Sequence, residues 1–210
     1  MVRSLVVICI TVVLAMGCVC ADPEIVAGNT TEPAQPVQPQ PRPPATKLEA
    51  FMSSTGQLFV QEAYPVGVLE YGSVLTGGPA KLEADAIVVY QPSKEADRIR
   101  GLSIEIQETG RYGQTETKYL DFEELEGLFN ALTYIDNLAE KWKGTKRDGT
   151  TTVTYVTKSH FQVGFTQTGD KRKAIALCGE FLTAAMRIEM DDFILLRNMV
   201  DNAFKILKDK

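Results

Sequence analysis

The residues best suited to nucleophilic catalysis are few and scattered in this sequence. His160 is the single histidine, with Ser159 beside it and Cys178 further along. A serine or cysteine nucleophile needs a base, a third group that holds the base and an oxyanion site, and the chain has neither a Gly-x-Ser-x-Gly motif nor a papain-type cysteine context. The tripeptide Lys158-Ser159-His160 is typical of a tight connection between strands, so His160 is predicted to be exposed. We therefore predict no catalytic residue and favour a protein that is not an enzyme.

The remaining candidates for chemistry are two acidic clusters: Asp121, Glu123 and Glu124, and Glu189, Asp191 and Asp192. Calcium takes about six to eight oxygen ligands, usually from a loop of Asp, Asn and Gly residues, and neither cluster has that pattern. Each cluster begins an amphipathic segment, where helix capping accounts for it. The shortage of histidine and cysteine excludes a zinc site, and phosphate-binding motifs are missing. The sequence therefore predicts neither a metal nor a cofactor.

Aromatic residues offer a weaker candidate, for binding rather than catalysis. Tyr64, Tyr71, Tyr90, Phe161 and Phe165 lie on or beside predicted strands. If several of them share the sheet face away from the helices, they form an aromatic surface for a ligand. The alternative is that they pack in the core or along its rim, where aromatic residues are usually found.

The first 21 residues have the layout of an export signal. Arg3 is followed by the unbroken apolar run Leu5–Ala15 and then by Val19-Cys20-Ala21, whose Val and Ala occupy the −3 and −1 positions read by a signal peptidase. The apolar run is too short to span a bilayer. We predict cleavage between Ala21 and Asp22, and a periplasmic or secreted protein.

The positions of the cysteines limit the disulfides of the mature chain and add an alternative to cleavage. Three of the four cysteines lie in the predicted signal, so cleavage leaves Cys178 as the one cysteine of the mature chain. A secreted chain of this size without an intramolecular disulfide favours a bacterial source and needs a hydrophobic core. Cys178 is predicted to lie in that core, with a thiol that cross-links two chains as the alternative. Ala15-Met16-Gly17-Cys18 partly matches a lipobox, so the alternative to cleavage is lipidation of Cys18 and a membrane-anchored lipoprotein.

A proline-rich segment follows the signal. Residues 22–46 contain seven prolines, with Gln and Thr between them and few large apolar side chains. Such a segment cannot bury enough surface to offset the entropy of ordering it, and proline stiffens it toward polyproline II. We predict a disordered linker over residues 22–46, either a spacer or a tolerated tail, and a single domain over residues 47–210.

The charge of the chain argues against a nucleic-acid partner. The sequence has 22 basic and 27 acidic side chains, a net charge of −5, and removal of the signal takes away Arg3. Binding to nucleic acid requires clustered Lys and Arg. The longest basic run, Lys171-Arg172-Lys173, follows Gly169-Asp170 and is predicted to be a solvated turn. Membrane association is expected only through a lipid on Cys18.

Hydrophobic periodicity predicts strands and two helices. Apolar and polar residues alternate in Ile99–Gln107, as in a half-buried antiparallel strand. Further strands are predicted over residues 58–60, 66–71, 80–90, 151–157, 161–166, 174–178 and 184–188. Apolar residues recur three or four apart in Asp121–Lys143 and Met190–Lys208, which predicts two amphipathic helices. Asp121 and Glu124 suit a capping box at the first helix, and Asp191 or Asp192 is expected to cap the second.

These elements predict an α+β fold, with an antiparallel sheet of six to nine strands and two amphipathic helices packed on one face. The segments Leu120–Leu125 and Ile188–Phe193, which lead into the two helices, resemble each other. This similarity suggests two strand-strand-helix half-repeats that share one continuous sheet.

Three functions are compatible with the sequence. The leading hypothesis is an exported, non-enzymatic domain that binds an unknown protein or small ligand at the cell envelope. One alternative is a secreted hydrolase that uses carboxylates. The other is a structural or assembly subunit, in which a sheet edge pairs with another copy of the chain.

Overall fold

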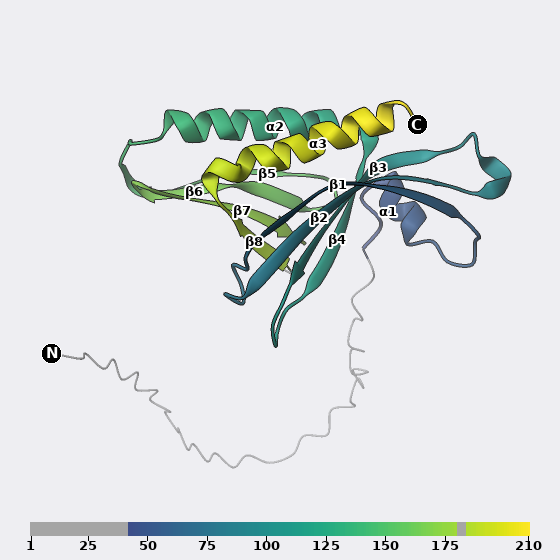
Figure 1. Ribbon diagram of the computed structural model, residues 1–210, viewed down its shortest axis with the longest axis horizontal. Helices are drawn as coiled ribbons and strands as arrows, with labels where there is room; N and C mark the ends of the chain where they lie inside the picture. The colour runs from purple at the N-terminus through teal and green to yellow at the C-terminus, as the bar shows by residue number, and fades with distance from the viewer. Residues whose placement is uncertain (1–41, 180–183) are drawn as a thin grey trace, which may run out of the picture. The chain divides into compact units, whose positions relative to one another are not determined.

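The computed structural model of the chain describes residues 42–179 and 184–210 (Figure 1). The predicted export signal, its cleavage site between Ala21 and Asp22, Cys18 and the linker as far as residue 41 lie outside the described residues. Within the described residues, none of the helices has the length and apolar character needed to cross a membrane.

Two four-stranded antiparallel sheets, each followed by a long helix, make up the domain. Sheet A contains β1 (Val60–Gly72), β2 (Pro79–Tyr90), β3 (Ile99–Glu108) and β4 (Thr115–Asp121), and leads into α2 (Phe122–Lys141). Sheet B contains β5 (Arg147–Val156), β6 (Phe161–Gly169), β7 (Lys171–Cys178) and β8 (Ala184–Ile188), and leads through the 3-10 turn η2 (Met190–Asp192) into α3 (Phe193–Lys208). A short helix, α1 (Lys47–Met52), and a 3-10 turn, η1 (Pro92–Lys94), complete the described elements. The predicted α+β class is confirmed.

The chain has two similar halves, β1–β4 with α2 and β5–β8 with α3. These halves are larger than the predicted half-repeats, and they do not share one continuous sheet. Each half has four strands and one helix. Ser73, just after β1, forms an isolated bridge with Met186 of β8, and the Val74 N–H donates to the Ala185 carbonyl at 2.9 Å. Stacking two sheets buries the apolar face of each against a shared core, which a single wide sheet would leave partly uncovered.

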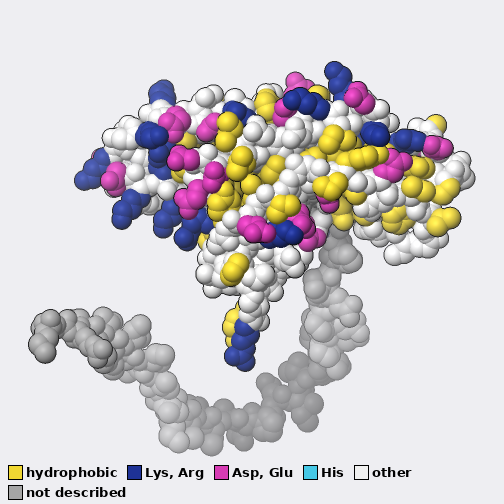
Figure 2. Space-filling model, viewed as in Figure 1, with side chains coloured by type: hydrophobic (Ala, Val, Ile, Leu, Met, Phe, Trp, Pro, Cys, Tyr) yellow, Lys and Arg dark blue, Asp and Glu magenta, His cyan; other side chains and the backbone are white. Residues whose placement is uncertain are grey.

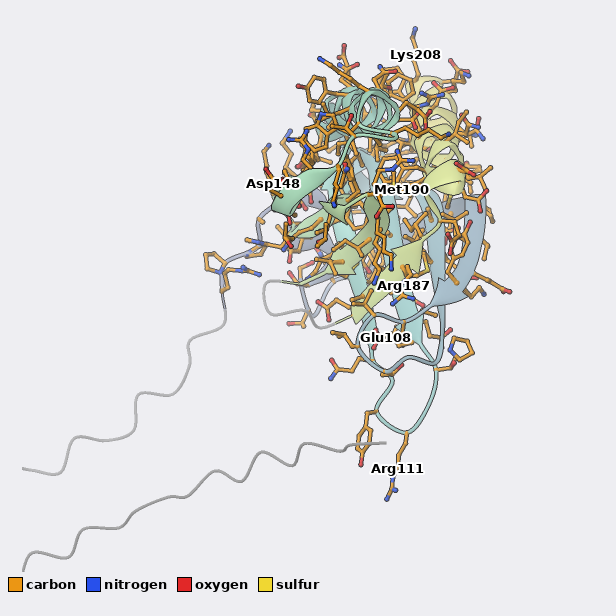
Figure 3. The ribbon with its side chains drawn as sticks, turned by 90° about the vertical axis from the view of Figure 1, so that its left-hand side faces the viewer. Glu108, Arg111, Asp148, Arg187, Met190 and Lys208 are labelled. Carbon is orange, nitrogen blue, oxygen red and sulfur yellow. The ribbon has the colours of Figure 1, made fainter. Side chains whose placement is uncertain are left out.

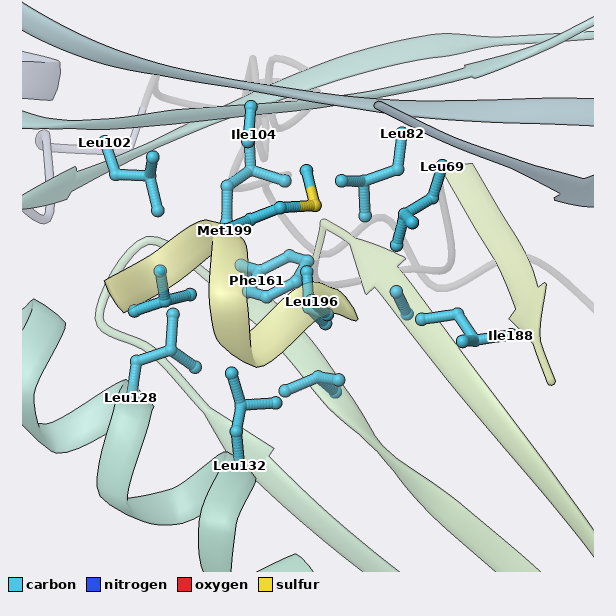
Figure 4. Close-up of a cluster of buried hydrophobic side chains, with 14 of the residues drawn as sticks. Leu69, Leu82, Leu102, Ile104, Leu128, Leu132, Phe161, Ile188, Leu196 and Met199 are labelled. Atoms are coloured by element: carbon cyan, nitrogen blue, oxygen red, sulfur yellow. The ribbon is translucent and has the colours of Figure 1, made fainter. Parts of the chain in front are cut away.

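The core lies between the sheets and the two long helices (Figure 4). It contains Leu82 and Ile104 from sheet A, Phe161 from sheet B, Leu132 from α2 and Met199 from α3 (Figure 4). The helices lie side by side, and each one crosses between halves: α2 contacts β5 and β6 as well as β3 and β4, whereas α3 contacts β1, β2 and β3. Each helix therefore covers strands of the half that does not precede it.

The first predicted helix forms nearly as expected, whereas the second differs at its start. Asp121 is the N-cap of α2 and forms the capping box with Glu124. The second helix begins at Phe193 rather than Met190, because η2 occupies the preceding three residues. Asp192 is its N-cap by position, but its side chain makes no capping hydrogen bond. The Asp192 carboxylate instead accepts a hydrogen bond from Tyr71 of β1, so the expectation that it caps the helix was wrong.

The short helix α1 was not predicted, and it covers one end of the outer face of sheet A. Leu48 is fully buried against Ile87 and Val89 of β2. The Asp121 carboxylate accepts the N–H of Lys47 at 3.0 Å and that of Leu48 at 2.9 Å, so it holds the first turn of α1. Asp121 therefore serves two helices at once.

Candidate functional site

The five aromatic candidates all lie on the inner, core-facing sides of the sheets. Phe161 and Phe165 are fully buried, so they offer no surface to a ligand. Tyr64, Tyr71 and Tyr90 are half-buried and pack against the core. Binding by these three tyrosines stays a prediction, and the contacts they make in the structure are described next.

Tyr64 and Tyr90 share the carboxylate of Glu62 at one end of sheet A. The Tyr64 hydroxyl donates to Glu62 Oε2 at 2.6 Å, and the Tyr90 hydroxyl donates to Oε1 at 3.3 Å. The bond from Tyr64 is the main reason why the pKa of Glu62 is lowered. Lys210 lies 4.6 Å from the Tyr64 ring centroid, and Arg98 lies 4.8 Å from that of Tyr90. This network joins β1 and β2 to the segment after α3.

The half-buried hydroxyl of Tyr71 makes the stability of the fold depend on pH. This hydroxyl donates to Asp192 Oδ2 at 2.6 Å, and burial, followed by that bond, raises its pKa from 10.0 to about 12. The neutral phenol is therefore favoured in the folded state, so its contribution to stability is complete below pH 10 and is lost as the pH rises toward 12. We expect the free energy of unfolding to fall more steeply between these two pH values in the native chain than in Tyr71→Phe. Urea unfolding across that range checks this, and parallel curves would contradict it.

The nucleophile candidates sit in or beside the turn between β5 and β6. His160 is half-buried rather than exposed, has a φ of 64°, and donates its N–H to the Thr157 carbonyl at 3.1 Å. Burial is the main cause that lowers its pKa. Cys178 is fully buried on β7, and burial raises its pKa to about 12. Such a thiol is inert at neutral pH, which favours its interpretation as a core residue.

The first acidic cluster contributes to helix ends, whereas Asp192 of the second cluster bonds to a strand of sheet A. Asp121 is the N-cap of α2 and accepts two backbone N–H groups of α1. Glu123 pairs with Lys47 at 3.0 Å, and Asp192 accepts a hydrogen bond from Tyr71. Across residues 42–179 and 184–210, no group of three His, Cys, Asp or Glu side chains is placed to hold a metal ion.

The outer face of sheet B, which the sequence did not single out, has the most distinctive chemistry. We name it the threonine–lysine face, and define it by Thr150, Thr152, Thr154, Gln162, Thr166, Thr168, Lys171 and Lys173. These residues alternate along β5, β6 and β7 with the core-facing residues of the same strands, so their side chains point away from the core. All are exposed or half-buried.

Strand register arranges this face into two equivalent rows. Thr150 pairs with Thr168, which pairs with Lys171, and Thr152 pairs with Thr166, which pairs with Lys173. The hydroxyls of Thr150 and Thr168 are 2.9 Å apart, and those of Thr152 and Thr166 are 3.3 Å apart. Each row therefore carries two hydroxyls and one ammonium group in the same order.

A hollow of about 410 Å³ lies on this face, lined by Thr166, Thr168, Lys171 and Lys173. Among the described residues, Lys171 and Lys173 form no ion pair. The charged side chains that line the hollow are thus those of two lysines, neither of which forms an ion pair with another described residue.

More Lys and Arg side chains lie near the hollow, at the end of the molecule where β6 turns into β7 (Figure 2). Figure 2 shows Lys and Arg side chains gathered at the end where α2 finishes and β6 turns into β7. The Arg147 guanidinium lies 3.8 Å from the Trp142 ring centroid, and Arg172 is 13% exposed and pairs with Glu140 at 3.9 Å. Figure 3 views the molecule from this end, with Asp148 at the start of β5 and Arg187 on β8. The predicted solvated turn at Lys171–Lys173 is instead the start of a strand.

The outer face of sheet A has the opposite charge. We name it the acidic face, and define it by Glu70, Lys81, Glu83, Asp85 and Glu105. Glu83 and Glu105 are direct cross-strand partners on β2 and β3. Burial raises the pKa of Asp85, and the charges of Glu83 and Glu105 raise it further. The two sheets therefore present outer surfaces of opposite sign.

Comparison with known proteins adds no assignment to this geometry. No family model matches the chain, and no curated protein matches it at a significant level.

Proposed function

We propose that the chain is an exported, non-enzymatic binding domain of the cell envelope, and that its threonine–lysine face binds an anionic partner. Two equivalent Thr-Thr-Lys rows are the observation that supports this proposal, and one threonine and the lysine of each row line the same hollow. The signal-like residues 1–21 support export, and the proline-rich segment supports a tethered or free domain beyond it.

The chemistry of the rows suits carboxylate, phosphate or sulfate oxygens. An oxyanion accepts hydrogen bonds only, and the face offers donors of two kinds, hydroxyl and ammonium. When two threonine hydroxyls bond to each other, one hydrogen is used and the second remains available to a ligand. Lys171 and Lys173 add positive charge that no acidic side chain of the described residues neutralises through an ion pair. Hydrogen bonds to charged groups are the stronger ones.

The probe that tests this proposal is heparin, a sulfated polysaccharide, immobilised on a column. A chain with a net charge of −5 should pass through such a column unless its cations are gathered on one surface. We expect retention at low salt, and about tenfold weaker affinity in the double variant Lys171→Thr, Lys173→Thr. The elution salt concentration and a binding isotherm with free heparin measure the change.

A matched control removes the same charge elsewhere. Lys94 lies in η1, between two strands of sheet A, and Lys208 is the last residue of α3, and both are exposed. The double variant Lys94→Thr, Lys208→Thr should elute with the native protein. Equal elution of both double variants, or flow-through of the native protein, would rule the proposed face out.

The sequence is also compatible with two other functions. The hydrolase that uses carboxylates stays a prediction, because no observation in the structure favours it. The assembly subunit, predicted to pair through a sheet edge, also stays a prediction. The opposite charges of the two outer sheet faces favour a different contact between copies, through the faces, and we develop it next.

A further inference from the structure

We propose that the anionic partner of the threonine–lysine face is the acidic face of a second copy of this chain. The inference rests on the proposed function, since it names the carboxylates that the two Thr-Thr-Lys rows would bind. The two surfaces lie on different sheets, so one molecule presents both.

The acidic face offers carboxylates without matching cations. Lys81 forms an ion pair with Glu83 and is the cross-strand partner of Glu70. No other cation belongs to this face, so Asp85 and Glu105 add to an excess of negative charge. Glu105 accepts a hydrogen bond from Thr117 at 3.0 Å, which satisfies one oxygen and neutralises no charge. The excess negative charge of the acidic face is therefore available to cations of a partner.

Carboxylates on the acidic face also repel one another in the isolated chain. Glu83 and Glu105 are directly opposite on neighbouring strands, and like charges in that position are destabilising. Asp85 lies two residues from Glu83 on β2 and so points to the same side. Ammonium groups from a second molecule would relieve this repulsion. The same groups, Lys171 and Lys173, lack an ion pair within the described residues of their own chain.

The spacing of the charges matches on the two faces. Lys171 and Lys173 alternate on β7, as Glu83 and Asp85 alternate on β2. In an extended strand, side chains two residues apart are separated by about 6.8 Å. Two lysines on one copy can therefore meet two carboxylates on another without a change in either backbone. Val68, which is 51% exposed and pairs with Glu83 across β1 and β2, adds apolar surface at the same place.

The arrangement fixes the type of assembly. Because different surfaces of the two molecules meet, the contact is heterologous, and repetition produces a ring or an open chain.

The acidic face is accessible to a second molecule. α1 packs on one end of the outer face of sheet A, against Ile87 and Val89, and leaves the acidic residues uncovered. An association carried by exposed charges is weakened by salt.

Sedimentation of the purified full chain tests the inference. At about 0.1 M salt, where the screening length is about 10 Å, we expect the average mass to rise with protein concentration. At about 1 M salt, where the length is about 3 Å, we expect the monomer. A native chain that stays monomeric at about 1 mM protein in the lower salt would overturn the inference.

A charge-swap experiment identifies the surfaces. One variant carries Lys171→Glu and Lys173→Glu, and the other carries Glu83→Lys and Asp85→Lys. Each variant alone should be monomeric, because its two faces then have the same sign. An equimolar mixture should associate, because every contact again pairs opposite charges. A mixture that stays monomeric would contradict the assignment, and circular dichroism checks that each variant is folded.

The heparin experiment separates this inference from the proposed function. If heparin binding depends on Lys171 and Lys173 while the native chain stays monomeric, the anion-binding face stands and the second copy is the wrong partner. If neither heparin nor a second copy binds, both proposals fail.

Discussion

Replacing Gly164 by alanine is expected to lower the free energy of unfolding by more than about 3 kcal/mol, or to prevent folding. Gly164 lies in the middle of β6 and pairs with Thr154 and Ile175. A Cβ atom at this position would lie 1.9 Å from the Val153 carbonyl oxygen and 2.9 Å from the Thr154 Cα. Both are backbone atoms of β5, so relief of the clash requires β5, the edge strand of sheet B, to move away from β6. Urea unfolding followed by the fluorescence of Trp142 measures the loss.

Gly149 is the matched control for this change, because it lies in β5 of the same sheet. A Cβ atom there would meet nothing within 4 Å. Gly149→Ala should therefore change the free energy of unfolding by less than about 0.5 kcal/mol. If Gly164→Ala unfolds at the same urea concentration as Gly149→Ala, the close approach of β5 to β6 described above is wrong.

The second large effect is expected at Asp121. Its carboxylate is 6% exposed and accepts the backbone N–H groups of Lys47 and Leu48, while its own N–H donates to Glu124 Oε1 at 3.3 Å. Asp121→Ala removes the acceptor for two N–H groups of α1 and the cap of α2. We expect a loss of about 2–4 kcal/mol in the free energy of unfolding, from unpaired buried donors and a missing cap. Amide hydrogen exchange should also become faster in Leu48 and its neighbours.

Two further substitutions separate capping from charge. Asp121→Asn keeps one acceptor oxygen and should cost less than Asp121→Ala. Glu123→Gln removes the neighbouring carboxylate, whose ion pair with Lys47 is exposed, and should cost less than about 1 kcal/mol. Equal losses for Asp121→Ala and Asp121→Asn would mean that the charge of Asp121, rather than its acceptor oxygens, provides the stability.

Local sequence patterns predicted the elements whose signals lie within a few residues. The capping box of Asp121 and Glu124 and the apolar spacing after it predicted α2 almost to its ends. β8 begins and ends at the predicted residues. The prediction for α3 was three residues too long, because Met190 fits the apolar spacing of the helix while its backbone follows a 3-10 turn. α1 was missed because six residues are too few for a periodic pattern.

The division into two sheets depends on contacts between residues far apart in the sequence. Alternation of apolar and polar residues in β2 and β3 shows that one side of each strand is buried, but not which strands lie beside them. Phe161 and Phe165 illustrate the same limit, because period two places them on one face without saying that this face meets the helices. Only the positions of α2 and α3 in the structure show that this face is buried.

The threonine–lysine face was hidden in the sequence for a related reason. Thr150 and Thr152 are separated by many residues from Lys171 and Lys173, and only the register of β5, β6 and β7 brings them into rows. A one-residue shift of register would point the same side chains at the core. The available signal was the alternation of Thr in β5 and of Lys in β7, which becomes informative once β6 is known to lie between them.

The crossing of α3 onto sheet A has a consequence for biosynthesis. The apolar faces of β1, β2 and β3 are complete long before residues 193–208 leave the ribosome, yet α3 contacts these three strands. At about 5–20 residues per second, several seconds separate the synthesis of sheet A from that of its covering helix. The nascent chain therefore cannot close its core during this interval. Under the export proposed above, this delay would leave the chain unfolded when it reaches a secretion channel that accepts only unfolded polypeptides.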